Sequence, residues 1–234
     1  MEDRSLADRN NIYIEDVIDV KELQNLQDNW AKATNLAFVS VDCNGTPITE
    51  YSKFTPFCEK LREIDEFRER CHYCDACGGR KAKRIGKAYA YICHAGLIAF
   101  AIPIMIKGQY VGAILAGQVT STDFQDLKPI TPASKGWQEN EELMKLYKQV
   151  AVMPAEKILA VAQILCDSYN YSVEKQYANK VDAELREKDL KLIKDRYPIL
   201  GLPLIRGVVT FCSSMVNGVK ALMYSADFYP EEEG

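Results

Sequence analysis

The residues best suited to chemistry are crowded into one short segment, Cys71–Gly79, which reads CHYCDACGG. The chain has only 2 histidines and 8 cysteines among its 234 residues, yet this segment contains His72 and three of the cysteines. The second histidine, His94, directly follows Cys93 in YICHAGL, so both histidines adjoin a cysteine. Thiols and imidazoles placed this closely are typical of metal binding or thiol chemistry.

The spacing within this segment predicts a metal site. A C-x2-C pair allows a tight turn to direct both sulfurs toward one ion, and both Cys71 with Cys74 and Cys74 with Cys77 have that spacing. The remaining ligands must come from elsewhere, and Cys58 and Cys93 lie at the edges of adjoining elements. We therefore predict a thiolate site that holds zinc or an iron–sulfur cluster, formed by Cys58, Cys71, Cys74 and Cys93. The alternative is that these thiols are buried and pack as small hydrophobic side chains.

Catalytic arrangements of the same residues find little support. A nucleophilic pair of Cys93 with His72 has no evident third residue to orient it. A redox CxxC motif belongs in a thioredoxin-like βαβ unit, whereas this cluster is expected between two helices. The segment GGRKAKRIGKA lacks the spacing of a phosphate-binding loop. We predict no catalytic residue, and hence a protein that is not an enzyme.

Composition and charge indicate where these residues work. With 47% hydrophobic and 26% charged residues, the chain is typical of a soluble globular protein. A net charge of -4 does not supply the cationic field of non-specific nucleic-acid binding, so we expect no direct binding to nucleic acid. The acidic, polar start MEDRSLADRNNIYIEDV is unlike a secretory signal, which predicts a cytoplasmic protein with reduced cysteines.

The pattern of apolar residues predicts an α+β protein whose antiparallel sheet positions the cysteines. A strand is expected at Ala37–Asp42, before the turn pair Asn44-Gly45. Three further apolar segments, rich in β-branched or aromatic residues, are expected as strands, and the last two form a hairpin: residues 88–93, 97–106 and 110–119. Helical spacing begins at Val20 and again after Pro56, and GGRKAKRIGKA is expected as a short basic helix.

A long helix is predicted over residues 154–197, because Pro154 opens a continuous helical pattern. The pattern is apolar as far as Tyr171 and heavily charged afterwards, so its second half should leave the domain. Three apolar residues in that half have near-heptad spacing: Val181, Leu185 and Leu192. We predict a signalling helix that pairs two protomers into a homodimer, and the alternative is a solvated terminal helix.

Four blocks of the chain together resemble the PocR sensory domain: LQDNWAKATNLAFVSVDCNGTPIT, FTPFCEKLR, RCHYCDACGG and YAYICHAGLIAFAIPIMIKGQYVGAILAGQV. They follow the family's order and spacing over residues 15–173. The resemblance implies a PAS/GAF-like fold, an antiparallel sheet flanked by helices, that senses short diols or simple hydrocarbon derivatives. The family's recurrent cysteines fall on the predicted quartet, and Cys77 is an extra one. By this resemblance the cluster is a fixed corner beside the sensing cavity.

A cavity for a small, weakly polar molecule needs apolar walls and a few placed hydrogen-bonding groups. Six residues lie on the elements expected to line it, with His94 as a polar handle: Trp30, Phe54, Tyr91, His94, Phe100 and Gln118. We predict a non-enzymatic sensor that binds a small ligand and relays its state through the C-terminal helix. The alternatives are a redox or metal sensor that acts through the cysteine cluster and a thiol-dependent enzyme that uses Cys93.

The end of the chain departs from the resemblance. We expect a sensory domain at residues 15–173, a helical linker at 174–197 and an amphipathic tail at 198–234, whose apolar residues from Val208 to Met223 fit one helical face. The output module that usually follows such a domain is expected outside this chain. The tail resembles the opening of an uncharacterised bacterial membrane-protein family, sometimes described as predicted metal-dependent enzymes, through Arg206, Gly207, Gly218, Lys220, Ala221, Ser225 and Ala226. This implies association with a membrane protein or a membrane surface.

Overall fold

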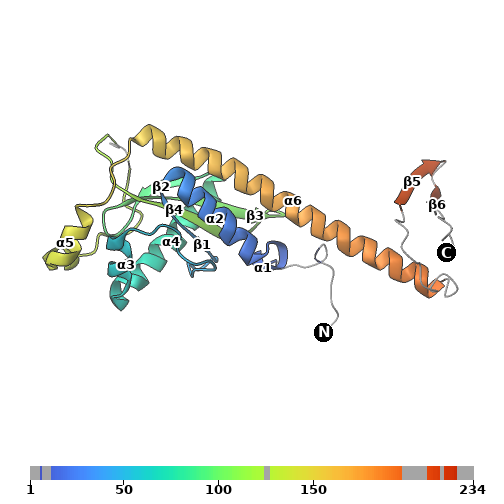
Figure 1. The fold of residues 1–234 in the computed structure, drawn as a ribbon, viewed down its shortest axis with the longest axis horizontal. Helices are drawn as coiled ribbons and strands as arrows, with labels where there is room; N and C mark the ends of the chain where they lie inside the picture. The colour runs from blue at the N-terminus through green and yellow to red at the C-terminus, as the bar shows by residue number, and fades with distance from the viewer. Residues whose placement is uncertain (1–5, 7–11, 124–126, 197–209, 217–218, 226–234) are drawn as a thin grey trace, which may run out of the picture. The chain divides into compact units, whose positions relative to one another are not determined.

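The computed structural model describes residues 6, 12–123, 127–196, 210–216 and 219–225. By internal contacts, residues 1–182 form one unit and residues 183–234 form a second. The predicted fold class is confirmed, because the first unit holds an antiparallel sheet flanked by helices and a long helix follows it in the chain (Figure 1).

The sheet has four antiparallel strands in the order β1-β4-β3-β2. Their bounds are Ala37–Val41 for β1, Tyr89–Ile92 for β2, Ile98–Ile106 for β3 and Gln109–Val119 for β4. The predicted hairpin joins β3 to β4 through Lys107 and Gly108, whose φ angles are 50° and 75°. Positive φ at both positions is what a two-residue type I′ hairpin turn requires.

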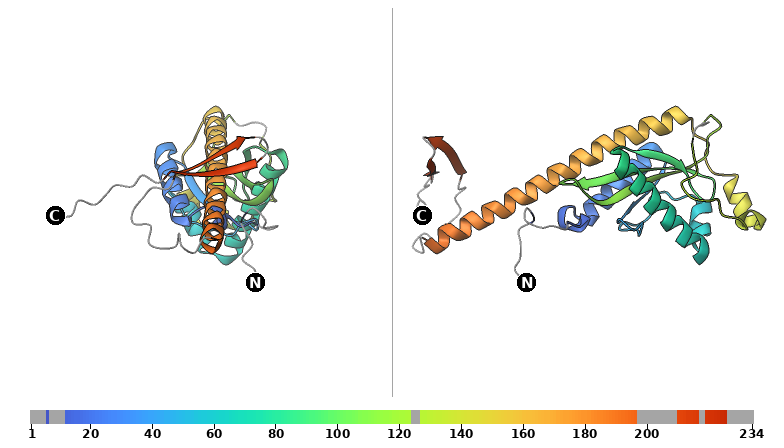
Figure 2. Two further views of the ribbon diagram at one scale, coloured as in Figure 1. Left: turned by 90° about the vertical axis from the view of Figure 1, so that its right-hand side faces the viewer. Right: turned by 180° about the vertical axis from the view of Figure 1, so that it is seen from behind.

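Helices cover both faces of this sheet because strand side chains alternate between the faces. On one face, Phe38 and Phe100 share a core with α1 (Ile14–Val17), α2 (Val20–Thr34) and α6 (Ala155–Arg196). On the other face, Val39 and Leu115 pack with Ala82 of α4 (Asp65–Ile85). Figure 2 shows α2 and α6 on one side of the sheet and α4 on the other.

A third cluster lies where two short helices meet the loop after β2. It combines α3 (Pro56–Arg62), the 3-10 helix η2 (Trp137–Glu139) and α5 (Glu141–Tyr147). The ring of Phe57 meets Trp137 edge-on at a centroid distance of 5.0 Å. These contacts hold α3, and therefore Cys58, against the end of the sheet.

The cysteine cluster corrects one expectation, since it lies inside a single helix, α4, and not between two helices. Gly78 and Gly79 continue this helix although glycine costs about 1 kcal/mol relative to alanine in a helix interior. A Cβ atom on Gly78 would lie 2.5 Å from the ring of Tyr91, and one on Gly79 would collide with the hydroxyl of Tyr110. The two glycines therefore permit α4 to approach the sheet closely, a tertiary requirement that local sequence patterns do not reveal.

The second unit contains a two-stranded antiparallel sheet, β5 (Thr210–Val216) and β6 (Val219–Ser225). The helical face expected for the tail is therefore wrong for residues 210–216 and 219–225, whereas Val208 and Val209 lie outside the described residues. The signal that was missed is the dipeptide Asn217-Gly218, which favours a two-residue hairpin between β-branched segments. Among the described residues, no helix combines the length and the apolar character that crossing a membrane requires.

Candidate functional site

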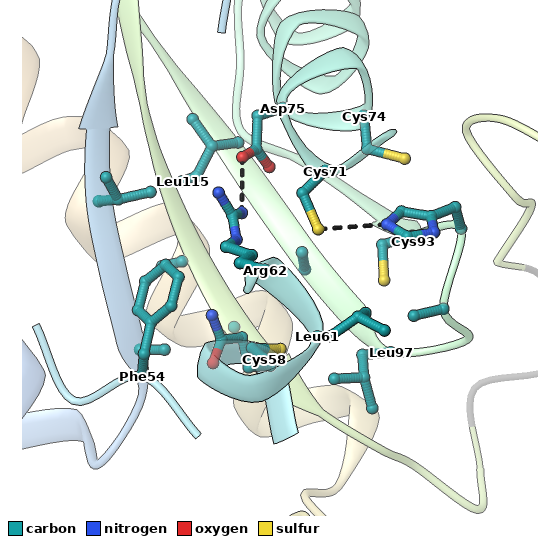
Figure 3. Close-up of a pocket in the computed structure, with 18 residues that line it drawn as sticks. Phe54, Cys58, Leu61, Arg62, Cys71, Cys74, Asp75, Cys93, Leu97 and Leu115 are labelled. Carbon is teal, nitrogen blue, oxygen red and sulfur yellow. Dashed lines mark hydrogen bonds and ion pairs between the residues drawn. The ribbon is translucent and has the colours of Figure 1, made fainter. Parts of the chain in front are cut away.

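A cavity of about 50 Å³ lies on the face of the sheet that α3 and α4 cover (Figure 3). Much of its wall is apolar, including Val39, Phe54, Leu61, Leu97 and Leu115. Its polar side chains besides the cysteines are Arg62, Asp75, His94 and Gln118. Since one water-sized group needs roughly 10–15 Å³ on this measure, the cavity admits a molecule of only a few heavy atoms.

The four cysteines predicted from spacing all line this cavity. Cys58 comes from α3, Cys71 and Cys74 come from α4, and Cys93 directly follows β2. The Sγ atom of Cys71 lies 3.2 Å from Nε2 of His94, and that of Cys74 lies 2.9 Å from Oγ1 of Thr131. Cys77, the extra cysteine, accepts a hydrogen bond from Arg80 on the exposed side of α4. The fold thus gathers the predicted quartet at one place.

The described residues show no ready-made metal centre, because no group of three or more of their His, Cys, Asp and Glu side chains could hold an ion. Burial raises the pKa of Cys58 and of Cys74 to about 12 and also raises the pKa of Cys71 and Cys93. Without an ion the thiols are therefore protonated, and metal binding would release their protons. Binding of zinc or an iron–sulfur cluster stays a prediction.

His94 connects the cavity to the segment before η2. Its Nδ1 atom lies 2.7 Å from Oγ of Ser134, and the Ser134 amide donates to the His94 carbonyl. Burial lowers the pKa of His94 to about 4, so the ring is neutral near pH 7. Either neutral tautomer satisfies both ring contacts, because the Cys71 thiol and the Ser134 hydroxyl can each donate or accept a hydrogen bond. Sequence reasoning missed Ser134, because no short-range pattern links residues 40 positions apart.

An ion pair between Arg62 and Asp75 forms the most polar part of the wall. Nη2 of Arg62 lies 2.9 Å from Oδ2 of Asp75, and the two side chains are only 9% and 11% exposed. Burial opposes the charge on Arg62, yet Asp75 raises the pKa of Arg62 further above its ordinary value. Sequence reasoning missed both residues. The available signal was helical spacing, since Arg62 follows Cys58 and Asp75 follows Cys71 by four positions.

Aromatic rings hold the guanidinium group in place. The central carbon of Arg62 lies 5.2 Å from the ring centroids of both Tyr51 and Phe54, and these two rings stack on each other at 4.1 Å. Such cation–π contacts favour one orientation of the planar guanidinium. Figure 3 shows Arg62 reaching from α3 toward Asp75 on α4, with Phe54 on a neighbouring segment.

Three of the six residues predicted to bind a ligand line the cavity, namely Phe54, His94 and Gln118. The other three lie elsewhere. Trp30 packs against the core on the opposite face of the sheet. Phe100 faces that same core, because its neighbour Ala99 occupies the cavity side of β3. Tyr91 is fully buried beneath Gly78 of α4.

Gln118 joins the cavity wall to two helices. Its φ angle is 63°, a left-handed conformation that is uncommon for residues other than glycine. Its side-chain oxygen accepts hydrogen bonds from the amide and the hydroxyl of Thr55, at 2.8 and 3.1 Å, and Thr55 caps α3. Two positions later, the Thr120 amide donates to the carbonyl of Ala151, and the Met153 amide donates to the carbonyl of Thr120. That pairing leads directly into α6.

Comparison with known proteins identifies the family of the chain that forms this cavity. A family model described as the sensory domain found in PocR matches residues 16–177. The chain belongs to the PocR sensory domain family. The Regulatory protein PocR of Salmonella typhimurium (strain LT2) is 36% identical to it over 143 residues, which are 61% of this chain and 47% of that protein. The alignment thus spans about half the length of this curated relative. A second family model, described as a protein of unknown function (DUF1385), matches residues 202–234.

The whole cavity lies within the segment that matches the PocR sensory domain. The family description indicates a sensory domain, and the relative that shares it is named a regulatory protein. In this PocR domain, the imidazole that contacts a cavity thiol is that of His94, and its partner is Cys71. Among the described side chains, no hydrogen bond joins Cys93 to His72, the nucleophilic pair considered above. The raised thiol pKa values disfavour attack by these cysteines, because the thiolate is the nucleophilic form.

Proposed function

We propose that this chain is a non-enzymatic sensor. In this proposal a small organic molecule, a short diol or simple hydrocarbon derivative, binds in the cavity between the sheet and helices α3 and α4, and α6 relays its presence. The cavity supports this assignment because it combines apolar walls with a few convergent polar groups, as small-molecule sites do.

The observation that carries the proposal is the position of Gln118. This residue lines the cavity, holds the N-terminus of α3 through Thr55 and stands two positions before the pairing that leads into α6. Left-handed backbone at a residue other than glycine costs about 1–3 kcal/mol and often marks switch regions. A ligand that competes with Thr55 for the side-chain amide of Gln118 would therefore shift the balance between two conformations of this residue, provided that it binds one of them better.

The test combines binding with a readout on α6. We expect at least one diol of about two to four carbons to bind by isothermal titration calorimetry and to change amide hydrogen exchange at the start of α6. The variant Gln118→Gly keeps the backbone conformation accessible but removes the amide, so it should bind ligand without the change in exchange. Gln163→Ala, which removes an amide side chain at an exposed position of α6, is the control and should leave ligand binding and the ligand-induced change in exchange at the start of α6 as in the parent.

Two outcomes would count against the proposal. Absence of binding across the diols and related hydrocarbon derivatives would contradict the ligand. Saturable binding without any change in exchange at α6 would contradict the relay.

A redox or metal sensor is the second candidate, because four cysteines from α3, α4 and the loop after β2 converge on one cavity. Here oxidation of the thiols or loss of a metal would be the signal. Elemental analysis with a visible spectrum on anaerobically purified protein tests it, alongside Cys71→Ser. About one zinc per chain, lost in the variant, would support a clamp or metal receptor, and a diol response that persists in Cys71→Ser would contradict this candidate.

The arrangement of the remaining chain is also part of the proposal. We propose a sensory domain at residues 15–173, a helical linker at 174–197 and a separate module at 198–234 that associates with a membrane protein or membrane surface. The match of residues 202–234 to a different family supports a distinct module. The proposal further includes a cytoplasmic location and a homodimer formed through the long helix.

A further inference from the structure

The Arg62–Asp75 ion pair occupies an unusual position, because it lies in the wall of a mostly apolar cavity. Removing two charges from water is expensive, and well-packed apolar side chains of similar volume are often as stabilising as a buried ion pair or more so. A gain in stability therefore does not by itself explain why this ion pair is buried here. Because both side chains line the cavity, they are placed to contact a bound ligand.

The two partners retain unused hydrogen-bonding capacity. Arg62 donates to Asp75 through Nη2 and makes a long contact of 3.4 Å from Nη1 to the hydroxyl of Tyr51. Its buried Nε atom has no hydrogen-bond partner. On the acidic side, Oδ2 of Asp75 accepts the hydrogen bond from Arg62, and an ionised carboxylate has further lone pairs on both oxygens that can accept from a ligand. A buried donor without a partner costs about 1–3 kcal/mol, so a ligand that engages it would gain affinity.

The charges of the cavity wall are balanced. Arg62 contributes one positive side chain and Asp75 one carboxylate, and neither Lys nor a second Arg, Asp or Glu lines the cavity among the described residues. An anionic ligand would compete with Asp75 for the guanidinium and would leave a buried carboxylate unpaired, which is strongly unfavourable. A neutral ligand with a hydroxyl or amide group meets no such penalty.

We propose that the Arg62–Asp75 pair is the specificity-determining element of the cavity, which recognises the polar group of a neutral ligand through Arg62 and rejects carboxylates through Asp75. This inference rests on the proposed function, since it assigns a role within the same cavity. It adds the rule by which the cavity distinguishes ligands of equal size.

The test uses probes that differ in charge and share one three-carbon frame: lactamide, lactate and propane-1,2-diol. Lactamide and lactate have the same number of heavy atoms, so their difference in affinity reports charge. By calorimetry, we expect the parent chain to bind lactamide more tightly than lactate by about tenfold or more. Asp75→Asn leaves Arg62 without a counter-charge, so the preference should invert toward lactate.

Two further variants keep the test decisive. Asp65→Asn makes the same substitution at an exposed ion pair on the same helix and should keep the parent's preference. If Asp75→Asn does not fold, the double variant Arg62→Met with Asp75→Leu replaces the pair by apolar side chains, a change that buried ion pairs often tolerate. It should unfold cooperatively like the parent but bind lactamide and the diol at least about tenfold more weakly.

Specific results would overturn the inference. An unchanged preference in folded Asp75→Asn, or parent-like lactamide affinity in the folded double variant, would reduce the pair to a structural link between α3 and α4. Absence of binding by all three probes in the parent would also overturn it. The proposed function fails on different results, namely when the wider set of diols and hydrocarbon derivatives finds no ligand, or when a ligand that binds leaves exchange at α6 unchanged.

Discussion

The environment of His94 makes the stability of the protein depend on pH. The side chain is 2% exposed and contacts Cys71 and Ser134 through its two ring nitrogens. Burial is the main cause that lowers the pKa of His94 to about 4 from an ordinary 6.5, with Arg70 and Arg62 adding to the effect. As pH falls below about 6.5, the unfolded chain binds a proton that the folded chain refuses. Stability from this source is therefore complete above that pH and declines toward pH 4.

The first prediction is that the parent chain loses about 1–2 kcal/mol more stability than His94→Gln when the pH falls from about 7.5 to about 5. Glutamine removes the titrating ring but retains hydrogen-bonding groups near Ser134. Urea unfolding at both pH values measures the difference. Burial lowers the pKa of His72 as well, so His72→Gln is measured alongside to separate the contribution of His94 from that of the second histidine. Equal pH dependence in the parent and His94→Gln would contradict the role assigned to His94.

At the scale of elements, the close approach of α4 to the sheet sets the geometry of the cavity. Cys71, Cys74 and Asp75 all project from this helix into the cavity wall. The distance of the helix from the sheet is limited by Gly78, whose missing side chain leaves room for the ring of Tyr91. A shift of α4 would therefore move three cavity groups together.

The second prediction concerns Gly78→Ala, whose effects on stability through helix propensity and through packing are opposite in sign. Alanine favours the helix by about 1 kcal/mol, but its Cβ atom would lie 2.5 Å from the Tyr91 ring. Overpacking of this kind costs about 1–3 kcal/mol, so we expect net destabilisation in thermal or urea unfolding. Arg84→Ala, on an exposed position of the same helix, should change stability by no more than about 0.5 kcal/mol. A stabilised Gly78→Ala variant would show that α4 can move away from the sheet.

For the whole molecule, the relevant feature is the exposed apolar surface of α6. Leu185 and Leu192 are 49% and 66% exposed and lie seven positions apart on this helix. Apolar residues at that spacing are typical of helices that pair, which supports the proposed homodimer. Burial of leucine side chains between two copies would contribute about 1.5–3 kcal/mol for each one fully covered.

The third prediction is a concentration-dependent dimer in analytical ultracentrifugation. Leu185→Glu combined with Leu192→Glu should shift the protein to the monomer, because charge would replace the apolar contact. Glu187→Lys alters charge on another face of the helix and should leave the dimer intact. A parent chain that stays monomeric at high concentration, or a dimer that survives the double substitution, would contradict pairing through this face.

Local patterns in the sequence determined the elements and part of the cavity. Alternation and helical spacing are properties of short segments, so the hairpin of β3 and β4 and the helix α6 could be predicted from them. The short spacing of Cys71 and Cys74, with the resemblance to a known family, pointed to the quartet that meets at one cavity. The placement of Phe54, His94 and Gln118 on the cavity wall followed from the same elements.

Only the tertiary structure decided which groups meet across the fold. The pairing of Arg62 with Asp75 and the contact of His94 with Ser134 join separate elements, and their formation depends on the packing of α3, α4 and a distant loop. Trp30 and Phe100 have aromatic side chains of the kind expected in a ligand site, but they face the core beneath α2 and α6. The face of the sheet on which a side chain lies depends on the register of the strand and on the helices packed against that face. Both are set by long-range contacts and not by neighbours in sequence.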